Sequence, residues 1–399
     1  MFETIQSRGV DQILSLMLAF RSDPRDQKVD LVVGVYKDAN GDVPVMKAVK
    51  AAEKVLLEEE DTKTYVGMAG DAEYRAFVPP MLLGSEAKVI KEGRITSLQT
   101  VGGSGALKVG CDLLHGMNPD QLVWVSTPTW ANHIPVATDS GLKTAQYPYF
   151  RPSDRGLDFD GMMSHLEANA KAGDAILLHA CCHNPTGVDL SFEQWKIVTD
   201  FVLKRGLLPY VDCAYQGLGD GMEEDVAGLR YLAKRVPEML LASSFSKNFG
   251  IYRERTGALS IVARTPEELA VVQEAAKTAI RSNYSMPPSH GARVVATVLS
   301  DPAMKSDWAE ELEEMRERVA EMRSELRRML EERQVTRDLS FITDQKGMFS
   351  YTGFTKDEVV RLRDDFGIYT AGDGRMNVAA LAPENLEAVA DGFAAILRA

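Results

Sequence analysis

The chain has 399 residues, of which 45% are hydrophobic and 26% charged, so it is long enough for one large globular domain and a smaller one. Its 58 acidic side chains outnumber the 45 basic ones, and the formal net charge of −13 repels nucleic-acid phosphates and anionic membrane surfaces. No apolar run approaches the roughly 20 residues that a membrane span needs. We therefore expect no nucleic-acid partner and no membrane partner.

The first predicted element is an apolar stretch at residues 13–20. Glu3 and Asp11 precede it and no small-residue cleavage site follows, so the pattern favours an amphipathic helix capped by Asp11 over a signal sequence. The four cysteines do not form the disulfide framework of a small secreted protein. We expect a cytoplasmic protein.

Residues 95–265 alternate short aliphatic runs with longer helical patterns, separated by turns rich in Gly, Pro or Asn. This alternation is typical of the α/β class, with a mostly parallel sheet that helices flank on both faces. The expected buried strands lie at residues 97–101, 121–126, 175–180, 208–211, 239–242 and 257–262. Because ligands of such sheets bind beyond the carboxyl ends of the strands, the loops that follow are the candidate functional segments.

After Pro302 the pattern changes, because apolar residues recur at spacings of three and four in a strongly charged sequence. This predicts a long amphipathic helix with a solvated face. The elements expected after it are a strand near residues 348–351 and helices near residues 356–365 and 383–397. We predict a large domain at residues 45–305, and a second, smaller α/β domain that combines residues 1–44 with residues 306–399.

The loop after the first of these strands reads VGGSGAL at residues 101–107 and leads into an amphipathic helix. Gly103 lets the backbone approach a ligand, and the unpaired N–H groups at a helix start favour an anion. The loop matches neither the dinucleotide fingerprint nor the P-loop. Taken alone, it is either a phosphate site or an ordinary tight turn.

Two further loops carry polar groups directly after strands, CHNPTG at residues 182–187 and DCAYQG at residues 212–217. Asn184 is either a ligand-binding amide or a turn residue before Pro185. Asp212 follows an apolar run, where a lone carboxylate is costly and requires a cationic partner. The string HACCH that begins at His179 contains metal-ligand types, but alternate residues of a strand face opposite sides, so we expect no metal site.

A fourth loop, SSFSKNFGIYRER at residues 243–255, gathers hydroxyl groups, a lysine and two arginines. Any one of these side chains is compatible with an ordinary surface position. Together they indicate a site, because a lysine amine forms imines with carbonyl cofactors and its neighbours supply donors for a phosphate.

Eight motifs in the same order give the chain a resemblance to class I pyridoxal-phosphate aminotransferases of the aspartate and aromatic-amino-acid subgroup. The motifs are GVYKDANG (34–41), TYVGMAG (64–70), PTWANH (128–133), HNPTG (183–187), DCAYQG (212–217), SSFSKNFGIYRERTG (243–257), RSNYSMPP (281–288) and GRMNVAAL (374–381). The resemblance implies a fold type I enzyme with pyridoxal 5'-phosphate as cofactor and no metal. It also implies a ping-pong exchange of an amino group between amino acids and 2-oxo acids.

The resemblance also assigns roles to residues of this sequence. It implies that Lys247 holds the cofactor as a Schiff base and then moves a proton between two carbons. Asp212 would pair with the pyridine nitrogen, with His133 behind it, and Tyr215 and Asn184 would hydrogen-bond the phenolic oxygen. The remaining implied cofactor contacts are Trp130 stacked on the ring, and Gly103, Ser104, Ser244, Ser246 and Arg255 at the phosphate. Tyr65 would reach that phosphate from the other subunit, which implies a homodimer.

For the substrate, the resemblance implies that Arg375 clamps the α-carboxylate and that Arg281 crosses the dimer interface to the distal carboxylate. Trp130, Asn184 and Gly34 would also border the substrate, and the small domain would close over it.

The residues that indicate the substrate pair do not all agree. Thr64, Met286 and Ser104 depart from the aspartate-specialised pattern, whereas Val35 and Lys37 resemble it. We predict 2-oxoglutarate and glutamate as one pair, with aromatic amino acids, aspartate or both as the other. The alternatives are an aspartate-specialised aminotransferase, a lyase on the same scaffold, or a cofactor-binding regulator, for which the sequence offers no DNA-binding module.

Overall fold

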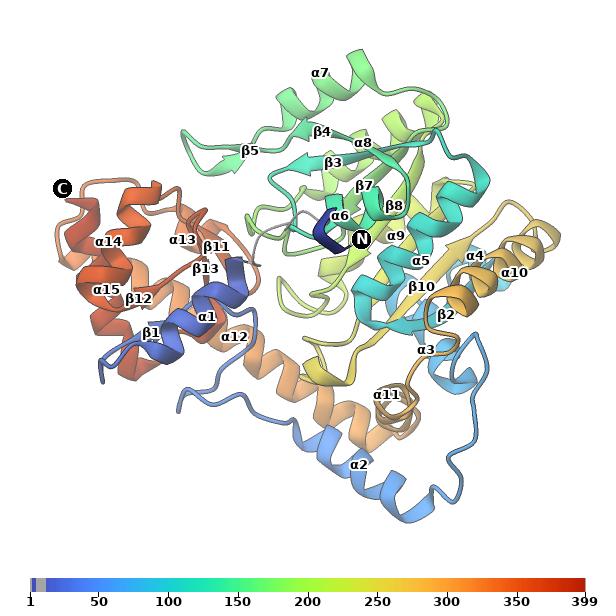
Figure 1. Cartoon of the computed structure of the whole chain (residues 1–399), viewed down its shortest axis with the longest axis horizontal. Helices are drawn as coiled ribbons and strands as arrows, with labels where there is room; N and C mark the ends of the chain where they lie inside the picture. Colours follow the sequence, from blue (N-terminus) through green and yellow to red (C-terminus); the bar gives the residue numbers. More distant parts are fainter. Residues whose placement is uncertain (1, 5–11, 399) are drawn as a thin grey trace.

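The structure, a computed structural model, describes residues 2–4 and 12–398, so the predicted helix cap at Asp11 lies outside the described residues. A large sheet with helices on both faces forms most of the molecule, and a smaller group of helices and short strands packs at one end (Figure 1). The expected mostly parallel α/β arrangement is therefore present. Within the described residues, no helix has the length and apolar character needed to cross a membrane.

The central sheet has the strand order β2-β10-β9-β8-β7-β3-β4. Its strands are β2 (Ile95–Val101), β3 (Leu122–Thr127), β4 (Lys143–Pro148), β7 (Ala175–His179), β8 (Leu208–Cys213), β9 (Met239–Ser244) and β10 (Thr256–Val262). Neighbouring strands are parallel except that β10 is antiparallel to both β2 and β9. Strand β4 was not predicted, because an edge strand is partly exposed and its sequence KTAQYP carries no continuous apolar run.

The helices cover the two faces of the sheet with separate hydrophobic cores. One face carries α5 (Gly102–Met117), α6 (His133–Asp139) and α10 (Pro266–Asn283), and the other carries α7 (Phe159–Asn169), α8 (Phe192–Arg205) and α9 (Ala227–Arg235). Each helix buries an apolar stripe, such as Leu107 and Leu114 of α5 or Trp195 and Val198 of α8. This packing fixes the loops at the carboxyl ends of the parallel strands.

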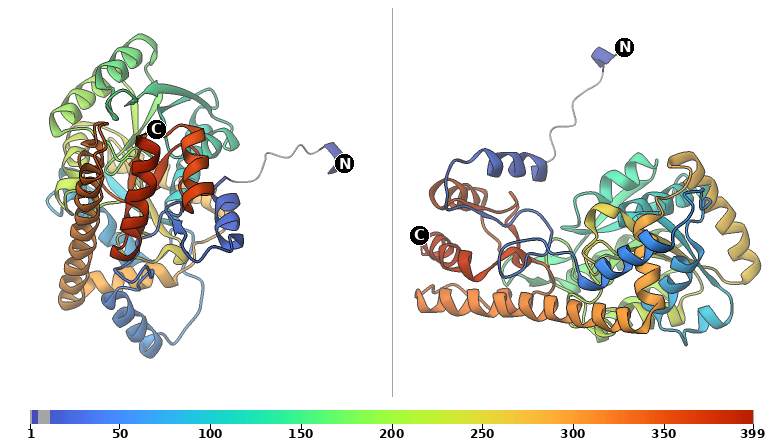
Figure 2. Two further views of the ribbon diagram at one scale, coloured as in Figure 1. Left: turned by 90° about the vertical axis from the view of Figure 1, so that its left-hand side faces the viewer. Right: turned by 90° about the horizontal axis from the view of Figure 1, so that it is seen from below.

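The predicted long helix is α12, Pro302–Glu332, and it runs from the edge of the large sheet into the smaller part of the molecule (Figure 2). Its stripe of Trp308, Leu312, Met315, Val319 and Leu326 is buried along its length. Because α12 is continuous across position 305/306, the predicted domain boundary falls within its first turn, and the division into two domains stays a prediction. The other elements around it are α2 (Lys47–Glu59), α3 (Ala72–Leu83), α4 (Lys88–Lys91) and α11 (His290–Ser300).

The smaller part combines both ends of the described chain. Strand β1 (Val29–Asp30) pairs in parallel with β12 (Ile368–Tyr369), and β11 (Phe349–Tyr351) pairs antiparallel with β13 (Arg375–Asn377). Its helices are α13 (Phe341–Asp344), α14 (Lys356–Phe366) and α15 (Pro383–Leu397). The remaining short elements of the molecule are β5 (Phe150–Arg151), β6 (Gly156–Leu157), and the 3-10 helices Phe2–Thr4, Glu224–Val226, Tyr252–Glu254 and Val378–Ala380.

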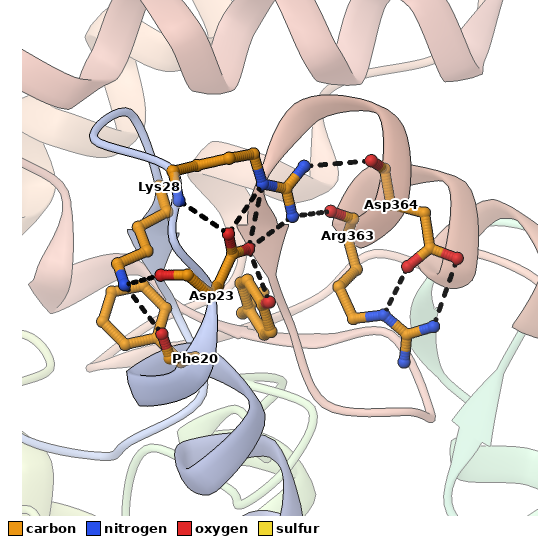
Figure 3. A network of polar contacts seen from close by, with 7 residues as sticks. Phe20, Asp23, Lys28, Arg363 and Asp364 are labelled. Carbon is orange, nitrogen blue, oxygen red and sulfur yellow. Dashed lines mark hydrogen bonds and ion pairs between the residues drawn. The ribbon is translucent and has the colours of Figure 1, made fainter.

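Helix α1 (Gln12–Ser22), which contains the predicted helix at residues 13–20, is attached to this smaller part by a polar network (Figure 3). Arg25 donates to the main-chain oxygens of Arg363 and Asp364 at the end of α14, at 2.8 and 2.9 Å. The carboxylate of Asp23 accepts from Arg25 and from the hydroxyl of Tyr369. The N-terminal segment is thereby fixed to the strand β12 that follows α14.

Candidate active site

The loops predicted to be functional meet around a cavity of about 280 Å³ at the carboxyl ends of β7 and β8. Ten predicted site residues line it, namely Gly103, Ser104, Trp130, Asn184, Asp212, Tyr215, Ser244, Ser246, Lys247 and Arg255. Leu107, Asn132 and Ala214 also line it and were not predicted. Asn132 lies in the PTWANH motif, after Ala131. It was missed because asparagine is common in ordinary turns, so the sequence alone does not distinguish a residue that lines a cavity from a turn residue.

Lys247 projects into this cavity from the loop after β9. Its Nζ lies 5.1 Å from the centroid of the Tyr215 ring. Burial lowers the pKa of Lys247 to about 8, while the charge of Asp212 opposes that shift. Near neutral pH a much larger fraction of this amine is neutral than in an ordinary lysine, and the neutral amine is the state that attacks a carbonyl.

Asp212 lies near the end of β8 and lines the cavity, and its Oδ2 lies 3.1 Å from Nε2 of His133. Burial alone raises the pKa of a carboxyl group, but the His133 hydrogen bond and nearby positive charge hold the pKa of Asp212 below its ordinary value. The structure thus pairs the buried carboxylate with a histidine, and it stays ionised. Residue 133 itself is buried behind Asp212 and does not line the cavity.

A set of hydrogen-bond donors that suits a phosphate lies around Arg255, at the start of α5. Arg255 directs Nη2 to Ser104 and Nη1 to Ser246, each at 3.4 Å from the hydroxyl oxygen. Gly102 has φ +67°, and a Cβ there would lie 2.4 Å from the Arg255 guanidinium, so only glycine lets the two approach. Free helix N–H groups, hydroxyls and one guanidinium together suit a dianion.

On the opposite side of the cavity, Asn184 connects Tyr215 with Arg375. The Asn184 amide donates to the Tyr215 hydroxyl at 3.3 Å, and its oxygen accepts from Arg375 at 3.4 Å. Burial raises the pKa of the Tyr215 phenol above its ordinary value.

Arg375 is a largely buried cation for which the described residues supply no carboxylate partner. Its Nη2 donates to the oxygen of Val32 at 3.0 Å, and its Nε is buried without an acceptor. The guanidinium lies 4.4 Å from the centroid of the Phe349 ring. Gly34 makes this packing possible, because a Cβ at that position would lie 2.7 Å from the Phe349 ring. Such a cation is suited to receive a carboxylate from outside the protein.

Two predicted site residues do not join this cluster within one chain. Tyr65 is 85% exposed on the segment between α2 and α3. Arg281 is exposed at the end of α10 and donates to the hydroxyl of Ser285.

The HACCH string folds differently from the strand alternation that we expected. Strand β7 ends at His179, and the chain then turns so that the His179 and His183 rings stack at 4.0 Å, on the same side. The ligand atoms of Cys181, Cys182 and Asp225 lie within 4.8 Å of one another. The carboxylate of Asp225, however, accepts three backbone N–H groups between residues 217 and 220, which leaves it little capacity for a metal.

The sequence model of the family "Aminotransferase class I and II" matches residues 26–393. An aspartate aminotransferase of Salmonella typhi is 44% identical over the whole of both chains, and an aromatic-amino-acid aminotransferase of Paracoccus denitrificans is 45% identical over 96% of each. A solved aromatic-amino-acid aminotransferase of Burkholderia pseudomallei, covalently bound to pyridoxal phosphate, is 44% identical. It superposes with a TM-score of 0.97 over 100% of this chain and 99% of that one.

Proposed function

The chain belongs to the class I and II aminotransferases, as its motifs predicted, and we propose that Lys247, Asp212 and Arg375 carry out its reaction. It is a pyridoxal-phosphate-dependent aminotransferase, and its relatives at 44% and 45% identity are named aspartate and aromatic-amino-acid aminotransferases, which supports both substrate classes. The observation that supports the residue assignment most directly is the buried Lys247 amine, which shares a cavity with the Arg255 donor set.

The donor chemistry of the cavity fits the cofactor. Ser104, Ser246 and Arg255 would hold its phosphate, and Asp212 would hold its ring nitrogen. Asn184 and Tyr215 would hold its phenolic oxygen, with Trp130 against the ring and Gly103 and Ser244 beside the phosphate. When bound, pyridoxal phosphate supplies a carbonyl group for imine formation and an electron-withdrawing ring.

The side chains of this protein then have distinct tasks. Lys247 accepts a proton at Nζ and returns it, for which a pKa of about 8 is suited. Asp212 keeps a fixed negative charge, because its hydrogen bond from His133 stabilises the carboxylate. Arg375 orients the substrate by its α-carboxylate, which fills the position where the guanidinium lacks a counter-charge. Gly34 borders this position.

We propose a homodimer, because Tyr65 and Arg281 are exposed and contribute nothing to the cavity of their own chain. In a dimer Tyr65 would serve the phosphate of the partner's site, and Arg281 would meet the distal carboxylate of aspartate or 2-oxoglutarate there. The proposed large domain (45–305) carries most of the cofactor contacts, and the proposed small domain (1–44 and 306–399) carries Arg375 and Gly34. Closure of the second on the first would bring Arg375 onto the substrate.

The proposed amino acceptor is 2-oxoglutarate. Met286 lies in the RSNYSMPP segment after Arg281, where an apolar, flexible side chain leaves room for an aromatic ring. The alternative is an enzyme specialised for aspartate. Catalytic efficiency with phenylalanine, tyrosine and aspartate decides between the two, and a loss of more than about a thousandfold with both aromatic substrates would favour the alternative.

The names of the relatives set aside a lyase on the same scaffold, and two arginines for carboxylates suit a cycle with a second acidic substrate. The absorption spectrum separates an aminotransferase from a lyase, since glutamate should convert the bound cofactor to its amine form and 2-oxoglutarate should restore it. We also propose that the protein is cytoplasmic, which is consistent with four free and buried cysteines.

A further inference from the structure

A second cavity lies behind the loop of residues 182–187, between α12 and the segments 218–220 and 343–347. Its volume is about 190 Å³. The charged side chains that line it are three cations, Arg316, Arg323 and Lys346, and one carboxylate, Asp220. A concave site with this excess of positive charge attracts anions. None of these four residues belongs to the active site described above.

Arg323 is the most unusual of the four because it is buried, at 4% exposed, and the described residues give it no carboxylate partner. Its Nη atoms donate to the main-chain oxygens of Ile342, Gly347 and Phe349 at 2.6 to 2.8 Å, and to the Ser350 hydroxyl at 3.2 Å. Its Nε is buried without an acceptor. Burial lowers the pKa of the guanidinium to about 10, so it remains charged at neutral pH. A buried cation without a counter-charge is unfavourable, and an anion would relieve that cost.

Lys346 and Arg316 are more accessible than Arg323, and each forms an ion pair with a partly exposed carboxylate. Lys346 forms an ion pair with Asp220, and Arg316 forms one with Glu313; both carboxylates are about half exposed. Exposed ion pairs contribute little stability, so a ligand oxyanion can replace these carboxylates. Ser324 and Thr343 add hydroxyl groups to the same lining.

We propose that this cavity binds a small oxyanion with two negative charges, of the phosphate or dicarboxylate class, between Arg323, Lys346 and Arg316. The volume accommodates an anion of a few heavy atoms and excludes a nucleotide. The site is also close to the chemistry, because Arg323 binds the main-chain oxygen of Phe349, and the Phe349 ring lies against Arg375. The cavity is therefore connected through Phe349 to the arginine that is proposed to receive the substrate.

The test uses the holoenzyme with Arg375→Ala, which removes the substrate carboxylate site and leaves the cofactor phosphate in place. Phosphate and, in a separate titration, succinate are added while the melting temperature is measured. We expect a saturable rise with at least one anion, because a ligand of the folded state stabilises it by mass action. Adding Lys346→Ala and Arg316→Ala should raise the half-saturating concentration at least tenfold. Lys305→Ala, an exposed lysine on the same helix, should leave it unchanged.

Arg323→Met also removes the site but risks the fold, so the exposed positions carry the test. A rise with phosphate alone identifies a free phosphate site, and a rise with succinate alone identifies a site for substrate-like dicarboxylates; both support the proposal. Two results overturn it. One is the absence of a saturable rise with either anion, and the other is a rise that Lys346→Ala with Arg316→Ala leaves unchanged. Selenate soaked into crystals of the holoenzyme should give an anomalous peak in this cavity, between Lys346 and Arg316.

Discussion

The Nε2 atom of His133 lies 3.1 Å from Oδ2 of Asp212, and the opposite ring nitrogen lies 2.7 Å from the Thr129 hydroxyl. This hydroxyl is also 3.3 Å from Nε2 of His179, whose Nδ1 faces the backbone N–H of Asn184 at 3.4 Å. That N–H can only donate, so Nδ1 of His179 accepts. Burial lowers the pKa of His179 to about 3, so the ring stays neutral and carries its proton on Nε2.

The direction of each hydrogen bond in this series, from Asn184 to Asp212, follows from that assignment. His179 donates to Thr129, Thr129 donates to Nδ1 of His133, and Nε2 of His133 therefore carries a proton that faces Asp212. The backbone N–H of Asn184 thus determines, through three side chains, that Asp212 receives a donor. The loop of Asn184, whose side chain hydrogen-bonds Tyr215 and Arg375, is thereby connected to the aspartate of the proposed ring-nitrogen contact.

Thr129→Val removes the hydroxyl in the middle of this series of hydrogen bonds and keeps the shape of the side chain. We expect kcat/KM to fall about tenfold, which corresponds to the roughly 1.4 kcal/mol of one net hydrogen bond. The pH at which the absorption of the bound cofactor changes should shift as well. Thr138→Val, an exposed threonine of α6, is the matched control. An unchanged pH profile would show that the Thr129 hydroxyl does not set the tautomer of His133.

Lys247→Ala should abolish turnover while the cofactor remains bound without a covalent link. The variant lacks both the amine that forms the imine and the group that moves the proton, so we expect a loss of at least about a thousandfold. Turnover and cofactor content are measured together, with Lys204→Ala, an exposed lysine of α8, as the control. Substantial transamination by Lys247→Ala would contradict the central residue assignment.

The lowered pKa of Lys247 also predicts how the cofactor-free protein depends on pH. Covalent capture of pyridoxal phosphate requires the neutral amine, so its rate should rise with pH and reach half its maximum near pH 8. Because the folded pKa lies below the unfolded value of 10.5, the unfolded chain binds more protons between these values. The stability of the cofactor-free protein should therefore rise from about pH 8 to pH 10. Lys247→Ala should lose this component of the rise, which thermal unfolding at several pH values measures.

The sequence predicted the parts of this site that follow buried strands, since apolar runs mark the strands and the polar residues come directly after them. Asp212 and Lys247 could be predicted in this way. Edge strand β4 and the pairing of β1 with β12 could not, because the residues of β4 are partly exposed, and β1 and β12 are too short to show a periodic pattern of apolar residues. The stacking of His179 on His183 depends on the chain turning after β7, which a strand pattern cannot indicate.

Arg375→Lys tests whether the planar guanidinium is what recognises the substrate. A lysine keeps the charge but cannot donate two parallel hydrogen bonds to one carboxylate, and it also loses the packing on Phe349. We expect kcat/KM to fall by roughly tenfold to a hundredfold for every amino acid, equivalent to one charge-assisted hydrogen bond of about 1.5–3 kcal/mol. Arg361→Lys, exposed on α14, should have no effect. A loss confined to aspartate would place the α-carboxylate elsewhere.

Mixing two inactive variants tests the shared active site directly. In a dimer of Lys247→Ala with Arg281→Ala, one of the two sites contains an intact Lys247 from one chain and an intact Arg281 from the other. Random reassembly should therefore restore roughly a quarter of the sites to full activity with aspartate, because about half of the dimers are hybrids with one intact site each. The assay compares the mixture before and after a cycle of unfolding and refolding. Mixing Lys247→Ala with Arg375→Ala, whose two side chains serve the same site of one chain, should restore no activity, because each site of the hybrid still lacks one of the two side chains. The discriminating control is the double variant Lys247→Ala, Arg281→Ala mixed with wild-type chains: its hybrids contain no intact site, so activity should fall below the wild-type share. If Arg281 acted within its own chain, those hybrids would keep one working site, and the activity per wild-type chain would stay constant.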